Sequence, residues 1–357
     1  MNIEQLKHIF NASPLVETIC NFLKEDEVKI QAKGLVGAAE SFVANGVFTK
    51  APGNYLFILN DKEEAAYFYN SLESISGIEK GTTLLFYPAS YRRPYQIEEI
   101  DNANVVQRTE VLSIIRKKRK NILVVTFPEA IVENVVTRKN LEKNTLEIEV
   151  GKNYSIDFIN ELLIEYDFEK EDYIYHPGQF AVRGGIVDIY SFSNDLPYRV
   201  EFFGDEVESV RIFNPEDQLS IQTVKKFSVV PNVSEKLIKE ERESFLNYIP
   251  QDTKIWIKDY ESAQAKIDKG YEKANYAFDK MVSEMRRLSP AQLYLAPSDF
   301  KRQIEEHKII EFGQRFFFKD AKQVLFDQQP QPPFNKNFDL LIEDLNTKSK
   351  ADYINVI

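Results

Sequence analysis

Residues 174–190 read Ile-Tyr-His-Pro-Gly-Gln-Phe-Ala-Val-Arg-Gly-Gly-Ile-Val-Asp-Ile-Tyr, and residues 197–213 read Pro-Tyr-Arg-Val-Glu-Phe-Phe-Gly-Asp-Glu-Val-Glu-Ser-Val-Arg-Ile-Phe. A turn rich in Ser, Asn and Asp lies between them. Successive side chains of a strand point to opposite faces, so the alternation of apolar and polar residues is typical of β-strands. The two stretches therefore predict a β-hairpin with one apolar face.

The second stretch predicts one apolar face and one face that combines charges with an aromatic ring. The apolar face holds Tyr198, Val200 and Phe202, and the mixed face holds Arg199, Glu201 and Phe203. A Phe beside an Arg on the face opposite the core is typical of protein-binding hot spots, where ring and guanidinium lose water together. A solvated strand face is the alternative.

Arg183 ends the preceding strand, directly before Gly184 and Gly185. Paired glycines permit a positive φ or a close approach of two backbones. A bulge or tight bend at these glycines would bring Arg183 beside Arg199.

The rest of the chain predicts an α/β protein with an insertion. Before residue 145 strand-like and helix-like segments alternate, which is typical of a parallel, doubly wound sheet with helices on both faces. Short strands and turns from about 146 to 230 predict a separate α+β domain. The alternation of strands and helices then resumes, with a helix expected over 238–248 and a strand over 254–257.

The C-terminal part begins with Asp-Gln-Gln-Pro-Gln-Pro-Pro at 327–333, a composition typical of a linker. The roughly 24 residues beyond it are too few for a domain, so we expect a fragment of a longer protein. The predicted division is 1–145, 146–230, 231–326 and 327–357, the last being the linker and the start of a truncated third domain.

Charge and composition restrict the function classes. The chain has 357 residues and a net charge of −11, which disfavours a protein whose main task is to grip a phosphate backbone. The basic run at 116–120 follows a helix-like segment at 105–115, so a helix C-terminus is its simpler explanation. Cys20 is the one cysteine, and neither a signal peptide nor a membrane-length apolar run is found, so we expect a bacterial cytosolic protein with no membrane partner.

Catalytic and metal sites are not expected. The three histidines, His8, His176 and His307, show no metal-ligand spacing, and no nucleophile elbow surrounds Ser41 or Cys20. We therefore predict no catalytic residue and no metal in this chain.

Residues 34–41, Gly-Leu-Val-Gly-Ala-Ala-Glu-Ser, have the frame of a phosphate-binding loop but not its chemistry. Such a loop needs a Lys before its last Ser, because that Lys reaches the β- and γ-phosphates. Here Glu40 precedes Ser41, and a carboxylate would repel a polyphosphate. The glycines Gly34 and Gly37 alone also fit the start of an ordinary helix.

Residues 178–212 closely resemble the family shared by the excision-repair helicase UvrB and the transcription-repair coupling factor Mfd. In that family the run Gly-Gln-Phe-Ala-Val-Arg-Gly-Gly, followed by Pro-Tyr-Arg-Val-Glu-Phe-Phe-Gly-Asp-Glu, marks the small domain that docks on UvrA. The resemblance implies that Arg183, Arg199 and Phe203 face UvrA, and that Glu201 holds Arg199 in position. It also implies a degenerate helicase-like (RecA-like) parallel-sheet domain, interrupted by an inserted α+β domain with antiparallel hairpins.

The resemblance extends to the acidic pair that organises Mg²⁺ in such ATPases. Lys258 takes the position of the metal-binding Asp, and Asp259 replaces the catalytic Glu. Glu40 stands in place of the phosphate-binding Lys, and Lys258 in place of the metal-binding Asp. The charge at each of these two nucleotide-contacting positions is therefore reversed. The resemblance thus implies no ATP or Mg²⁺ in this chain, with both used elsewhere in a full-length parent that translocates on DNA.

The stretch at 87–95, which includes Tyr91-Arg92-Arg93-Pro94, is much shorter than the DNA-inserting hairpin of UvrB. The resemblance is therefore to the coupling-factor branch. It implies UvrA as partner and, for the parent, stalled RNA polymerase, double-stranded DNA and masking of the UvrA surface by a C-terminal domain. The alternative is a nucleotide-dependent DNA-remodelling module related to UvrB.

Overall fold

The computed structural model describes residues 3–76, 82–90, 102–117, 120–231, 241–281, 288–328, 334 and 337–351. Several sequence features discussed above lie outside these residues. They are Tyr91, Arg92, Arg93 and Pro94, residues 118 and 119 of the basic run, and residues 329–333 of the proline-rich segment.

The larger body is built on a seven-stranded parallel sheet in the order β17-β1-β16-β15-β2-β4-β3. Its strands are β1 (Lys29–Lys33), β2 (Tyr55–Ile58), β3 (Thr83–Phe86), β4 (Ile122–Thr126), β15 (Lys254–Lys258), β16 (Lys308–Gly313) and β17 (Lys322–Leu325). The central strands β2 and β4 are buried along their whole length, which is why they read as continuous apolar runs. Because β15 lies between β2 and β16, the chain returns to this sheet after the insertion.

Helices surround this sheet. They are α1 (Ile3–Asn11), α2 (Pro14–Phe22), α3 (Ala39–Lys50), α4 (Lys62–Ser76), α5 (Asn102–Lys117), α6 (Pro128–Ile131), α7 (Arg138–Lys143), α9 (Phe245–Tyr248), α10 (Tyr260–Lys280), α11 (Pro290–Leu293) and α12 (Pro297–Glu305). A further helix, α13 (Phe338–Lys350), has no buried residue. None of the helices in the described ranges is both long and apolar enough to cross a membrane.

Of the helix expected over 238–248, residues 238–240 lie outside the described residues, and the prediction is wrong for residues 241–244. Arg242–Glu243 form strand β14, which pairs antiparallel with β5 (Val135–Val136), and only Phe245–Tyr248 are helical. The Arg242 guanidinium also donates to the carbonyl oxygen of Asn134 at 3.1 Å. Tertiary pairing here overrides local helix propensity.

The smaller body holds a six-stranded sheet in the order β12-β11-β10-β9-β8-β7, antiparallel except between β7 and β8. The strands are β7 (Glu169–Lys170), β8 (Gln179–Arg183), β9 (Ile186–Ile189), β10 (Tyr198–Phe203), β11 (Glu206–Phe213) and β12 (Ser220–Val224). Each of the two predicted stretches thus forms a hairpin of its own. Residues 174–190 contain β8 and β9, and residues 197–213 contain β10 and β11. A separate ribbon pairs β6 (Leu146–Glu149) with β13 (Lys226–Val229).

The six-stranded sheet has two different faces. One face packs against α8 (Ile156–Glu165), where Ile159 and Leu163 join a core that includes Phe180 and Val200. The opposite face has only a small buried cluster, formed by Ile174, Ala181, Tyr190 and Phe213. That second face therefore presents its side chains outward.

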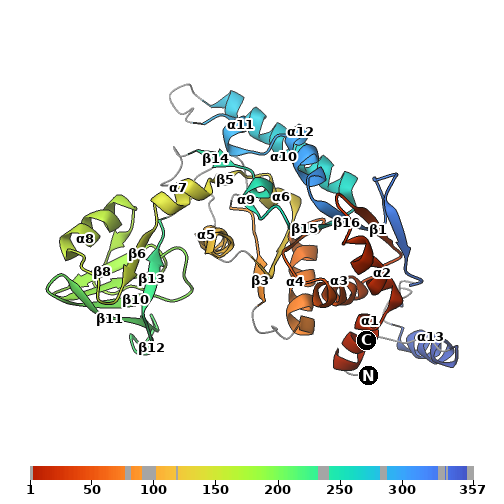
Figure 1. Ribbon diagram of the computed structural model, residues 1–357, viewed down its shortest axis with the longest axis horizontal. Helices are drawn as coiled ribbons and strands as arrows, with labels where there is room; N and C mark the ends of the chain where they lie inside the picture. The colour runs from red at the N-terminus through yellow and green to blue at the C-terminus, as the bar shows by residue number, and fades with distance from the viewer. Residues whose placement is uncertain are drawn as a thin grey trace.

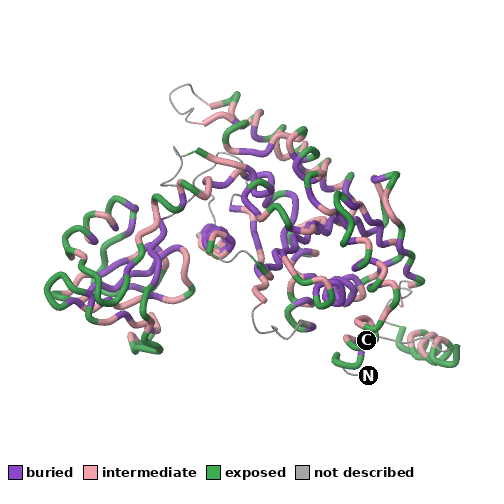
Figure 2. The backbone as a smooth tube through the Cα atoms, in the orientation of Figure 1, coloured by how far each residue is buried: buried purple, intermediate pink, exposed green. Residues whose placement is uncertain are grey.

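Figure 1 shows the two bodies side by side, with α5 and α7 between them. The Lys117 ammonium at the end of α5 donates to the Ser228 hydroxyl of β13 at 2.8 Å, and Val106 packs against the smaller core. Buried residues lie along both sheets and on helices that pack against them, such as α3, as Figure 2 shows. The predicted α/β class is confirmed, with a parallel-sheet domain interrupted by an inserted domain that has antiparallel hairpins.

Candidate docking face and degenerate nucleotide site

A fully buried carboxylate, Asp188 of β9, organises the outward face of the smaller sheet. The Arg199 Nε–Asp188 Oδ1 distance is 2.7 Å and the Nη2–Oδ2 distance is 2.9 Å, which is a bidentate pair. The Arg183 guanidinium donates to the same carboxylate. Two guanidiniums therefore share one carboxylate, and the cluster keeps a positive charge.

Arg199 is held from three sides. Its guanidinium lies 4.5 Å from the ring centroid of the buried Phe213 and donates to the Gln218 carbonyl oxygen at 3.3 Å. The hydrogen bond to Asp188 raises the pKa of Arg199, although burial acts in the opposite direction. Only 18% of the Arg199 side chain is exposed, against 36% for Arg183.

The turn between β8 and β9 explains how Arg183 reaches this cluster. Gly184 has a φ of +59°, a conformation that side chains disfavour, and a Cβ on Gly185 would lie 3.0 Å from the Phe202 carbonyl oxygen. Arg183 and Arg199 consequently lie beside each other. The Arg183 guanidinium also stacks on Tyr173, 5.3 Å from the ring centroid.

The expectation that Glu201 holds Arg199 is wrong. Glu201 accepts hydrogen bonds from the Arg211 guanidinium and, at 2.7 Å, from the Ser209 hydroxyl. The reason is register: Asp188 lies directly opposite Arg199 across β9 and β10, and Ser209 lies opposite Glu201 across β10 and β11. Cross-strand neighbours are closer than residues two apart on one strand.

Phe203 stands at the end of this face and is 81% exposed. Sequence reasoning placed Phe203 and both arginines on one face but did not select Asp188 or Arg211. The available signal for Asp188 was an acidic residue inside the otherwise apolar strand Ile186–Ile189.

The residues predicted to form a degenerate nucleotide site lie at the carboxyl edge of the parallel sheet, where ligands of such sheets bind. Lys258 ends β15, Glu40 lies in the first turn of α3, and Glu64 lies in the first turn of α4. The Lys258 ammonium donates to Glu40 Oε1 and Oε2 at 2.8 and 2.9 Å and to Glu64 Oε1 at 2.5 Å. The two charges that were predicted to be reversed therefore pair with each other.

Burial makes this triad tight. The Lys258 and Glu40 side chains are 13% and 10% exposed. Burial by itself lowers the pKa of Lys258, but the hydrogen bonds to Glu40 and Glu64 raise it overall. Burial raises the pKa of Glu40, and the neighbouring carboxylates Glu64 and Asp259 add to this effect while Lys258 opposes it. One ammonium is thus shared by an excess of carboxylates.

Asp259 serves the backbone. Its Oδ1 accepts from the amides of Gln314 and Arg315, both at 2.7 Å, and its own φ is +46°. A Cβ on Gly313 would lie 2.7 Å from the same carboxylate oxygen. Asp259 therefore fixes the loop after β16.

The start of the loop at 34–41 contacts residues that follow β17. Gly34 has a φ of +80°, and a Cβ there would meet the Phe326 carbonyl oxygen at 2.1 Å. The amide of Val36 donates to the Gln328 side chain at 3.0 Å, and Ser41 is buried. Gly37, with a φ of +58°, has open space around it. Within the described ranges no group of three or more His, Cys, Asp or Glu residues is placed to hold a metal ion.

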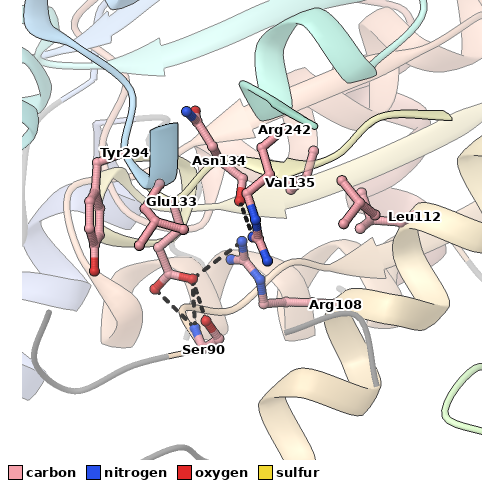
Figure 3. Close-up of a pocket in the computed structure, with 10 residues that line it drawn as sticks. Ser90, Arg108, Leu112, Glu133, Asn134, Val135, Arg242 and Tyr294 are labelled. Atoms are coloured by element: carbon pink, nitrogen blue, oxygen red, sulfur yellow. Dashed lines mark hydrogen bonds and ion pairs between the residues drawn. The ribbon is translucent and has the colours of Figure 1, made fainter. Parts of the chain in front are cut away.

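Figure 3 shows a pocket elsewhere in the larger body, lined by residues that include Ser90, Arg108, Glu133 and Tyr294. The Arg108 Nη2–Glu133 Oε2 distance is 3.3 Å, and the Ser90 amide donates to Glu133 at 3.1 Å. Its volume of about 30 Å³ suits a water molecule rather than a nucleotide. The pocket is a polar junction between α5 and β5.

Residues 146–234 match the family model described as the UvrB interaction domain. The chain is 26% identical over 243 residues to the transcription-repair-coupling factor of Bacillus subtilis, which covers 68% of this chain and 20% of that protein. It is 24% identical over 285 residues to the UvrABC system protein B of Treponema denticola, covering 74% of this chain and 41% of that one. A solved structure of Pif1 helicases at forked DNA has a TM-score of 0.15 and 12% identity over 97% of this chain and 99% of that chain, which is too low to indicate a shared fold.

These matches confirm the resemblance inferred from the sequence. Residues 146–234 are similar to the UvrB interaction domain, and the chain is similar over most of its length to transcription-repair-coupling factors and to UvrB. It spans about a fifth of the length of the coupling factors that it matches.

Proposed function

We propose that this chain recruits UvrA by presenting a UvrB-like docking face, as part of a transcription-repair coupling factor. The observation that carries the proposal is the Arg183–Asp188–Arg199 cluster, with the exposed Phe203 farther along β10, inside the segment that matches the UvrB interaction domain. A fixed guanidinium pair together with an exposed ring suits a partner surface that carries carboxylates and an apolar pocket.

Isothermal titration of the purified chain with UvrA tests this proposal. Phe203→Ala should weaken binding at least about tenfold, because large exposed rings are common hot spots. The fold should not change, since Phe203 is 81% exposed. Tyr67→Ala in α4 is the matched control, because Tyr67 is 77% exposed on the other body. Equal UvrA affinity of the wild type and Phe203→Ala would contradict the assignment of Phe203.

We also propose that this chain has no ATPase activity and that the larger body acts as a scaffold. Support comes from the Glu40–Lys258–Glu64 triad, which places carboxylates and a protein ammonium where phosphates and Mg²⁺ would have to enter. A titration with a fluorescent ATP analogue should show no binding up to about millimolar concentration. Micromolar binding would favour the alternative, a nucleotide-dependent DNA-remodelling module.

For the full-length parent we propose contact with stalled RNA polymerase, translocation on double-stranded DNA with ATP and Mg²⁺ bound elsewhere, and masking of the docking face by a C-terminal domain. The division at 145, 230 and 326 remains a proposal as well. Its support is the return of the chain to the parallel sheet at β15 after the segment that matches the family model.

A further inference from the structure

The edge strand of the smaller sheet is unusually open. β12 is exposed along nearly its whole length, and Leu219 and Ile221 are 67% and 59% exposed. Natural sheets protect such edges with charges, prolines, bulges or a covering element, because an open edge invites association. The run Leu-Ser-Ile-Gln-Thr-Val at 219–224 contains neither a charge nor a proline, and its protection is limited to one register shift and to Lys225 and Lys226 at its end. An open, uncharged edge with large apolar side chains is typical of a surface that a partner covers.

This edge is joined directly to the arginine cluster. Arg199 donates to both the carbonyl oxygen and the side-chain oxygen of Gln218, at 3.3 and 3.4 Å. Gln218 has a φ of +61°, and its side-chain Nε2 donates to the Pro215 carbonyl oxygen at 2.6 Å. The loop that leads into β12 is therefore fixed against Arg199, and Leu219 follows at once.

The register places Ile221 on the same side of the sheet as Arg199. Ser220 lies opposite Phe213 and Gln222 opposite Ile212, so Ile221 is an extra, bulged residue. Thr223 lies opposite Arg211, which lies opposite Arg199, and residues two apart on a strand point to the same side. Ile221 therefore faces outward beside the cluster.

The outward face consequently has apolar groups at both ends of its charged centre. Phe203 ends β10 on one side, next to Glu201. The pair Leu219 and Ile221 lies on the other side, beyond Arg199. In Figure 1 β12 lies at the lower rim of the smaller body.

We propose that Leu219 and Ile221 form a second apolar anchor for UvrA, so that the arginine cluster docks between two apolar contacts. This inference rests on the proposed function and extends it, because the partner surface must then carry a carboxylate region flanked by two apolar patches. Such an arrangement surrounds the charged centre with groups that exclude water, which strengthens the central ion pairs.

The test is UvrA titration with the double variant Leu219→Ser and Ile221→Ser. The matched control is Phe158→Ser with Ile164→Ser, because these α8 residues are 50% and 54% exposed on the opposite face of the same domain. The β12 variant should weaken UvrA binding at least about tenfold, while the α8 variant should stay within about twofold. Thermal melts followed by circular dichroism establish that both variants fold.

The other possible results distinguish failure of the second anchor from failure of the proposed function. If wild type binds UvrA, Phe203→Ala weakens binding and the β12 variant does not, the second anchor is wrong and the proposed function stands. If wild type does not bind UvrA, the proposed function itself fails. If sedimentation shows that wild type dimerises and the β12 variant is monomeric with unchanged UvrA affinity, β12 is a self-association edge and the inference is overturned.

Discussion

The docking face and the degenerate nucleotide site are built from opposite ion triads. On the docking face two guanidiniums, Arg183 and Arg199, share the single carboxylate of Asp188. At the nucleotide site two carboxylates, Glu40 and Glu64, share the single ammonium of Lys258. The first triad has a surplus of positive charge and the second a surplus of negative charge.

The two triads also differ in where the surplus lies. Arg183 is 36% exposed and adjoins open apolar groups, so its charge is available to a partner. Lys258 and Glu40 are nearly covered, so that site satisfies itself and would repel a phosphate. Buried ion pairs contribute little net stability but are costly to break, whereas exposed ones are cheap to rearrange. Under the proposed function, ion pairing closes the degenerate nucleotide site to nucleotide and leaves the docking face with a charge for a partner.

The largest effect is expected from Lys258→Met. Removing the ammonium leaves Glu40 and Glu64 facing each other without a counter-charge, which should lower the free energy of unfolding by about 3 kcal/mol. Urea denaturation at pH 7 measures it. The deficit should shrink towards pH 5, because two unpaired carboxylates favour protonation in the folded state and only there.

The control for this variant is Arg302→Met, which removes an exposed arginine paired with Asp299 and Glu306 on α12. Its unfolding curve should match the wild type, since exposed pairs contribute little. A Lys258→Met curve that also matches the wild type would show that the triad is not a structural tie.

A double-mutant cycle with Glu40→Gln and Lys258→Met measures how strongly these two residues are coupled. Each single change leaves a buried partner without its counter-charge, but the double variant removes both charges together. We expect a coupling energy of about 2 kcal/mol between the two positions, measured by denaturation of all four proteins. Additive effects would mean that Glu64 alone holds Lys258.

Asp188→Asn tests the docking triad. The neutral amide cannot serve two guanidiniums, so Arg183 and Arg199 should repel each other and separate. Asp188 is fully buried, but the Arg183 side chain is 36% exposed and Arg199 keeps its contacts with Gln218 and Phe213, so we expect a loss of about 2 kcal/mol in stability. UvrA binding should weaken more than stability predicts, since the arrangement of the guanidiniums is lost. A variant with wild-type UvrA affinity would exclude Asp188 as a positioning residue.

Much of the docking face was predictable because strand alternation is a local property. The side-chain period of two fixed the faces of Arg199 and Phe203, and two adjacent glycines predicted the bend beside Arg183. The choice of Asp188 over Glu201 as the partner of Arg199 depends on the register between β9 and β10, which no single strand encodes.

At the predicted nucleotide site, too, the pairing of side chains could not be predicted, because the partners are far apart in the sequence. Glu40 and Lys258 could each be identified as reversed charges, but they are 218 residues apart in sequence. Their pairing follows from the strand order that places β15 beside β2 and β16, after an entire inserted domain. Short segments such as β14 were missed because a two-residue strand has no periodicity of its own.

The smallest expected effect concerns Glu110 of α5, the helix between the two bodies. Burial, with the charge of Asp195 on the β9–β10 turn as a second cause, raises the pKa of Glu110 to about 7. A raised carboxyl pKa means that the folded state favours the neutral form, so this group costs stability as the pH rises from about 4.5 to about 7. Glu110→Gln should therefore match wild type near pH 4.5 and be more stable by about 1 kcal/mol at pH 8, after allowance for solvent screening. Thermal melts at the two pH values measure the difference, with Glu161→Gln on the exposed side of α8 as control. An equal gain at both pH values would mean that the substitution acts through packing or helix propensity and not through the charge of Glu110.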